Sequence, residues 1–117
     1  MTLNADAVAA ALAEISSADP DVIIHGLLRL SLSELDFREA QRQALHHASH
    51  IDDGVRGIAI LCLGHIARVY GQLDLAAAEP LVRTALKDAS NFVRGHADSA
   101  REDIRLFLKA PQFGICP

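Results

Sequence analysis

The stretch DDGVRGIAILCLGHIA, residues 52–67, decides the fold predicted for this chain. It opens with an acidic residue, two spacers and then Val55-Arg56-Gly57. Two relaxed copies of that opening occur elsewhere, Ile24-His25-Gly26 after Asp21 and Val93-Arg94-Gly95 after Ser90. A unit that recurs every few tens of residues is typical of folds built from stacked repeats.

The composition favours helices over strands. Half of the 117 residues are apolar, only four are Phe and one is Tyr, and there is no Trp. Alanine and leucine, which are good helix formers, supply most of the apolar residues. The length suits a single compact domain. We therefore predict an all-α fold, with one domain over residues 1–109 and an irregular tail over 110–117.

Periodicity and capping residues predict six helices. Apolar residues at helical spacing predict helices over about 5–16 and 20–33. A capping box at Asp36 and Glu39 opens a third helix, which ends before the turn at 49–54. The fourth helix runs to about Tyr70, a fifth spans about 75–88 with Pro80 bending or delaying it, and the sixth ends near 109. Taken two at a time in chain order, these helices form three predicted repeats, at about 5–33, 36–70 and 74–109.

These three pairs, each with its second helix opened by Asp-x-x-Val-Arg or a relaxed form of it, resemble HEAT repeats over residues 5–109. The resemblance implies a short α-solenoid, or armadillo-like superhelix, whose second helices line a concave surface that binds other proteins. In this interpretation the acid caps the second helix and pairs with the arginine. The residues given this structural role are Asp21, His25, Asp52, Arg56 and Arg94.

The charge of the chain argues against nucleic acid as a partner. Lys and Arg number 11 against 15 Asp and Glu, for a net charge of -4, whereas binding to phosphates needs a basic surface. Residues 1–51 hold seven acids and three bases, and the rest holds eight of each. This asymmetry favours a basic protein partner, although a merely solvated surface accounts for it equally well.

The sequence also predicts a cytoplasmic protein. Cys62 and Cys116 have neither the spacing of metal ligands nor the density of a disulfide scaffold, so reduced thiols are expected. The apolar N-terminus carries no basic segment and never reaches the length of a membrane span. We expect no membrane association.

One strip of the fourth helix is the predicted partner-binding face. Helical spacing places Gly57, Leu61, Gly64, His65 and Arg68 on this strip, and matching positions of the neighbouring second helices extend it. The alternative is that the glycines only allow close helix packing and that the charges are solvated. The residues predicted to contact a partner are Glu34, His65, Arg68, Glu102 and Asp103.

Metal and catalytic sites are not expected. His46 and His50 share one helical face, but no third ligand stands nearby, so we predict no metal and no cofactor. Arg56 and Arg94 could bind an anionic ligand, although a structural pairing with Asp52, Asp53 or Asp88 is favoured. His65 near Glu102 or Asp103 lacks a nucleophile or a phosphate loop, so enzyme activity and small-molecule ligands are not predicted.

Small bacterial proteins of this appearance are also similar to immunity proteins, which bind and neutralise secreted toxins, as in contact-dependent growth inhibition. The resemblance therefore implies a protein that occludes the active site or the substrate route of a basic toxin domain. The alternative is an adaptor that assembles a larger complex. A helical-repeat DNA-repair enzyme would need a basic groove, which the charge does not supply.

Overall fold

The computed structural model describes residues 3–109, and this part of the chain is all helical, with no strand. The predicted all-α class and the six helices are confirmed. The helices are α1 (Leu3–Ile15), α2 (Pro20–Leu32), α3 (Phe37–His47), α4 (Asp53–Tyr70), α5 (Leu75–Ala85) and α6 (Asn91–Phe107). None of these helices is long and apolar enough to cross a membrane.

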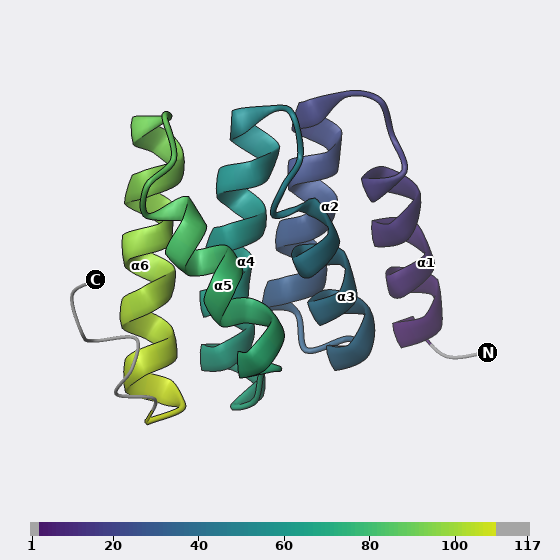
Figure 1. Ribbon diagram of the computed structural model, residues 1–117. Helices are drawn as coiled ribbons and strands as arrows, with labels where there is room; N and C mark the ends of the chain where they lie inside the picture. Colours follow the sequence, from purple (N-terminus) through teal and green to yellow (C-terminus); the bar gives the residue numbers. More distant parts are fainter. Residues whose placement is uncertain (1–2, 110–117) are drawn as a thin grey trace.

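The helices form a short solenoid in which α1, α2, α4 and α6 stand side by side in a row (Figure 1). Helices α3 and α5 contact each other and pack against the same side of α4. Successive helices pair as α1 with α2, α3 with α4 and α5 with α6. The second helices α2, α4 and α6 are therefore direct neighbours, as the repeat pattern predicted.

Helix α4 forms the centre of the core. It contacts α2, α3, α5 and α6, and ten of its 18 residues are buried. Ile60, Leu63 and Ile66 have no exposed surface. A helix covered on several sides must be apolar nearly all round, which explains the composition of residues 52–67.

A side-chain cap opens five of the helices. The oxygens of Asp19, Asp36, Asp52, Asp74 and Ser90 accept backbone N–H groups at the starts of α2 to α6. Such caps satisfy donors that have no partner inside the helix. At the other end of α4, Gly71 adopts the left-handed conformation with φ of 66° and donates its N–H to the Ala67 carbonyl.

Three predicted helix ends differ from the structure by two residues or more. Helix α1 begins at Leu3, two residues earlier than expected, and α6 ends at Phe107. Helix α5 ends at Ala85, not at 88, because the N–H groups of Lys87 and Asp88 turn back onto carbonyls only three residues earlier. Pro80 lies inside α5. The predicted tail, with Cys116, lies outside the described residues.

Candidate partner-binding face

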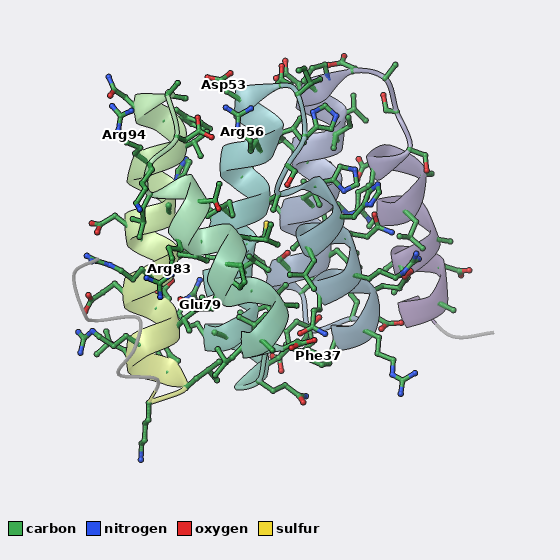
Figure 2. All side chains as sticks on the ribbon, viewed as in Figure 1. Phe37, Asp53, Arg56, Glu79, Arg83 and Arg94 are labelled. Carbon is green, nitrogen blue, oxygen red and sulfur yellow. The ribbon has the colours of Figure 1, made fainter. Side chains whose placement is uncertain are left out.

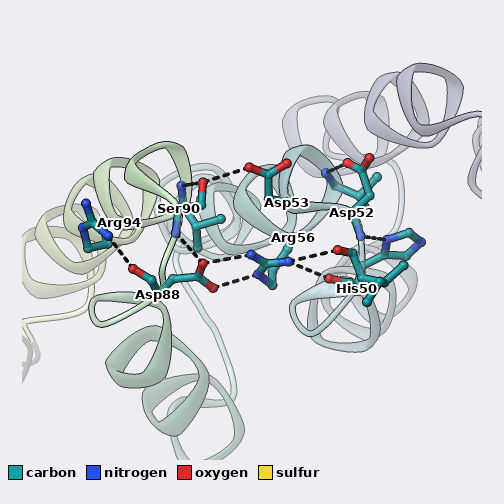
Figure 3. A network of polar contacts seen from close by, with 10 residues as sticks. His50, Asp52, Asp53, Arg56, Asp88, Ser90 and Arg94 are labelled. Carbon is teal, nitrogen blue, oxygen red and sulfur yellow. Dashed lines mark hydrogen bonds and ion pairs between the residues drawn. The ribbon is translucent and has the colours of Figure 1, made fainter.

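A polar network joins the N-terminal ends of α4 and α6 (Figure 3). The Arg56 guanidinium donates two hydrogen bonds of 2.8 Å to the Asp88 carboxylate. This pairing, with the hydrogen bond from the Ser90 N–H, lowers the pKa of Asp88 to about 2. The same contact raises the pKa of Arg56. Arg56 therefore stabilises the repeat, as its motif position suggested, with Asp88 as its partner.

Arg94 repeats part of this geometry one helix further on. Arg56 donates to the His50 carbonyl, six residues before it, and Arg94 donates to the Asp88 carbonyl, also six residues before it. Arg94 also contacts the Asn91 side chain. Both arginines thus hold the turn that precedes their own helix, and Figure 2 shows them at the same end of the molecule.

The three second helices open with one recurring turn, here called the cap turn. The side chain two residues before each cap accepts the backbone N–H of the cap residue, at 2.9 to 3.0 Å. A valine follows three residues after each cap. The acceptors are Ser17, His50 and Asp88, the caps are Asp19, Asp52 and Ser90, and the valines are Val22, Val55 and Val93.

The cap turn corrects the register of the first repeat. The motif assigned the capping acid of α2 to Asp21, whereas the pair Asp19-Pro20 predicts a cap at Asp19. The structure has Asp19 as the cap, and Asp21 lies in the first turn with its N–H bonded to the Asp19 side chain. The position of Arg56 and Arg94 is therefore occupied by Ile23 in α2. His25 instead contacts Glu14 of α1, with Nδ1 2.7 Å from the carboxylate. Residues 21–26 therefore match the motif in their letters, but they do not occupy the structural positions that the motif has in α4 and α6.

A partly exposed strip of α4 and the adjoining strip of α6 bring together three of the predicted contact residues. His65 is part-buried, and burial is the main cause of its lowered pKa, to which the charge of Arg68 contributes. The charges of Asp103 and His96 of α6 also act on His65, and Asp103 and His96 lie against Gly64 and Gly57 of α4. His65 Nδ1 is buried and has no hydrogen-bond partner among the described residues.

Glu34 and Glu102 lie outside this cluster. Glu34 is exposed in the turn after α2, with φ of 51°, and its charge acts on Tyr70 at the end of α4. Glu102 is exposed and forms an ion pair with Arg105 on its own helix. The structure therefore places His65, Arg68 and Asp103 together and the two glutamates apart.

Two aromatic side chains on this face had been missed. Phe92 is 44% exposed, and its ring lies against Gly57 and edge-on to His96, with the ring centroids 4.4 Å apart. The signal for Phe92 in the sequence is its position in the first turn of α6, two residues after the cap Ser90. Here we call His65, Arg68, Phe92, His96 and Asp103 the α4–α6 face.

The glycines of α4 serve close packing. A Cβ on Gly64 would lie 2.8 Å from the Ala100 Cα, and one on Gly57 would lie 2.7 Å from the Phe92 ring. Gly95, at the matching position of α6, has no atom within 4 Å of such a Cβ. Gly57 and Gly64 therefore allow α6 to pack closely, and the accessible part of the predicted strip consists of Leu61, His65 and Arg68.

The histidines of α3 and its following turn form a stack. The rings of His47 and His50 are stacked with centroids 5.9 Å apart, and His46 meets His47 edge-on. His47 Nδ1 donates to the Gln43 carbonyl at 2.9 Å. Within residues 3–109 there is no group of three His, Cys, Asp or Glu side chains arranged to hold a metal ion.

Cys62 is buried in α4, where burial raises its pKa to about 12. Its sulfur lies 3.6 Å from the Leu27 carbonyl of α2, so the thiol belongs to the junction between these helices. A neutral, enclosed thiol is a poor nucleophile. Cys62 therefore contributes to packing.

Comparison with known proteins gives one informative likeness. No protein-family model matches the chain, and no curated protein matches it. A chain in the crystal structure of a CDI complex from Cupriavidus taiwanensis LMG 19424 is 28% identical in sequence and superposes with a TM-score of 0.71. This likeness covers 85% of the present chain and 88% of that one. The resemblance to HEAT repeats stays a prediction.

Proposed function

We propose that this chain is an immunity protein that binds a cognate toxin domain and neutralises it without catalysis of its own. The observation that carries the proposal is the likeness, at 28% identity and over most of both chains, to a chain of a CDI complex. It would act in the cytoplasm, where such a toxin domain would meet its substrate. No cofactor is required.

The proposed mechanism is occlusion of the toxin's active site or of the route to its substrate. A surface formed by several parallel helices is well suited to this because it is rigid before binding, so little conformational entropy is lost on association. The α4–α6 face supplies an aromatic side chain and charged groups of both signs in one patch. Aromatic and arginine side chains commonly dominate the binding energy of protein interfaces.

A basic toxin domain is the proposed partner. The net charge of -4 favours attraction to a basic surface, which accelerates association at low salt. Co-expression with its cognate toxin domain should give a stable complex and protect cells from that domain. Absence of both binding and protection would exclude the immunity function.

The binding face is tested by reversing its acids. The triple variant Glu34→Lys, Glu102→Lys and Asp103→Lys should bind more slowly and lose most of its salt dependence. Asp103 should account for most of the effect because, of these three acids, it is the one whose charge acts on His65. Unchanged affinity would exclude this choice of residues.

A matched control carries the same change of net charge on other helices. Asp6, Glu39 and Glu79 lie on α1, α3 and α5, and their reversal to lysine also raises the net charge by six. If only the total charge matters, both triple variants should bind equally slowly. A larger loss in the first variant would localise the partner on the second helices.

A further inference from the structure

Ile51 is the most exposed large apolar side chain among the described residues. It is 94% exposed, whereas the next, Leu106, is 54% exposed. It occupies the cap turn between α3 and α4, directly before the cap residue Asp52. Single exposed apolar residues are common on protein surfaces, so exposure alone decides nothing.

The other two cap turns show that the fold does not need an isoleucine here. The residue directly before the cap is Ala18 in the turn to α2 and Ala89 in the turn to α6, and both are exposed. All three turns share the same side-chain bond to the N–H of the cap residue. Ile51 therefore places a large apolar side chain at a position where the two equivalent turns have alanine.

The turn that carries Ile51 is held in one conformation. Arg56 donates to the carbonyls of His50 and Ile51 at 3.0 and 3.3 Å. The Asp52 N–H donates to His50 Nδ1 at 3.0 Å, and the His50 N–H donates to the His47 carbonyl at 3.1 Å. These backbone groups already have partners, so a second protein can cover the turn without leaving them unsatisfied.

The surroundings of Ile51 are acidic. Asp52 and Asp53 follow it directly, and Asp53 is exposed while accepting a hydrogen bond from the Ser90 hydroxyl. Arg56 is paired with Asp88, and its single positive charge also acts on Asp52 and Asp53, so these three acids outnumber it. Two full negative charges outweigh the partial positive charge at the start of α4. A complementary surface would therefore surround an apolar pocket with basic side chains.

We propose that Ile51 is a preorganised anchor that inserts into an apolar pocket with a basic rim on the cognate toxin domain. The inference rests on the proposed immunity function and adds to it a second contact, at the cap turn of α4. An anchor held rigid before binding loses little conformational entropy when it is buried. Its removal should act mainly on the rate of dissociation.

The test uses the full chain and the purified toxin domain. Ile51→Ala, which copies the two other cap turns, should weaken binding by about tenfold or more and leave the Tm unchanged. Leu106→Ala, at the far end of α6, should bind like the wild type. Asp53→Asn should slow association at low salt and reduce its dependence on salt.

The outcomes separate the two proposals. If the wild-type chain does not bind the toxin domain, the immunity function fails and the anchor fails with it. If the wild type binds and Ile51→Ala binds equally well, the anchor alone is excluded. An unchanged salt dependence in Asp53→Asn would exclude the basic rim.

Discussion

The junction between α4 and α6 and the junction between α1 and α2 both place a glycine against a neighbouring helix, yet they are held differently. Gly64 of α4 faces the Ala100 Cα, and the same pair of helices is joined at one end by Arg56, Asp88 and Ser90. Gly26 of α2 faces the Ala11 carbonyl, and Glu14 of α1 pairs with His25 and Arg29. The first junction is closed by a part-buried polar network and the second by partly exposed ion pairs.

The difference follows from a single position of the cap turn. Four residues after the cap, α4 and α6 have arginine, whereas α2 has Ile23. Among residues 3–109, no side chain of α2 donates to the carbonyls of the turn before it, as Arg56 does for the turn before α4. We infer that stability is concentrated between α3 and α6, and that α1 is the first helix to separate under mild denaturation.

The largest expected effect is the loss of the Arg56 side chain. Arg56→Met would leave Asp88 without its bidentate partner and free the carbonyls of His50 and Ile51. Several charge-assisted bonds would be lost at once, so we expect the Tm to fall by about 10 °C. Thermal unfolding followed by circular dichroism measures this change.

Arg94→Met is the matched control for this substitution. Within the described residues, Arg94 hydrogen-bonds to the Asp88 carbonyl and the Asn91 side chain and to no carboxylate, although its charge contributes to the lowered pKa of Asp88. Its loss should lower the Tm by roughly half as much. Equal effects of the two variants would show that the bidentate pair adds nothing to the closure of the α4–α6 junction.

A smaller effect should come from filling the space between α4 and α6. Gly64→Ala should destabilise the protein by about 1–3 kcal/mol because the new methyl group meets backbone and has no room to move. Gly95→Ala lies in open space and should stabilise α6 by about 0.5–1 kcal/mol, since alanine is the better helix former. Urea denaturation of both variants gives the free energies of unfolding. Effects of the same sign would contradict the packing difference.

The fold could be predicted from the sequence because the residues that specify each helix lie within that helix or directly beside it. Helical spacing of apolar residues, cap residues such as Asp36 and Asp52, and the breaks between them specify the helices without any knowledge of contacts. The register of the first repeat was misread for a related reason. Residues 21–26 copy the letters of the motif, whereas Asp19-Pro20 carries the capping signal that the structure follows.

The candidate site was less predictable because it depends on how helices rotate against each other. Sequence spacing places Gly57 and Gly64 on the same strip as His65, but only packing shows that α6 covers the glycines. Asp103 and Glu102 are adjacent in sequence but lie on different parts of the α6 surface. The charge of Asp103 acts on His65, whereas Glu102 pairs with Arg105. Ile51 lies outside any periodic segment, so no pattern could single it out.

The smallest expected effect is on stability at acidic pH. It concerns Asp88 at the α4–α6 junction and Glu14 at the α1–α2 junction. In the folded protein the pKa of Asp88 lies at about 2, below the ordinary value of 3.8. A lowered pKa means that Asp88 stabilises the fold above about pH 4 and that this contribution is lost as the pH falls toward 2. Burial tends to raise the pKa of Glu14, but its bonds to His25 and Arg29 lower it overall.

Two single variants, each lacking one of these carboxylates, measure separately how much each junction contributes to stability in this pH range. Asp88→Asn should flatten the decline of unfolding free energy between pH 4 and 2, when urea midpoints are measured at each pH. Glu14→Gln should flatten it less, because His25 is 65% exposed and an exposed ion pair is weakened by water. If the Glu14 variant had the larger effect, the α1–α2 junction would be the more strongly coupled one. Both junctions contain a glycine that faces backbone, so the comparison of the two carboxylates tests the polar contacts at each junction.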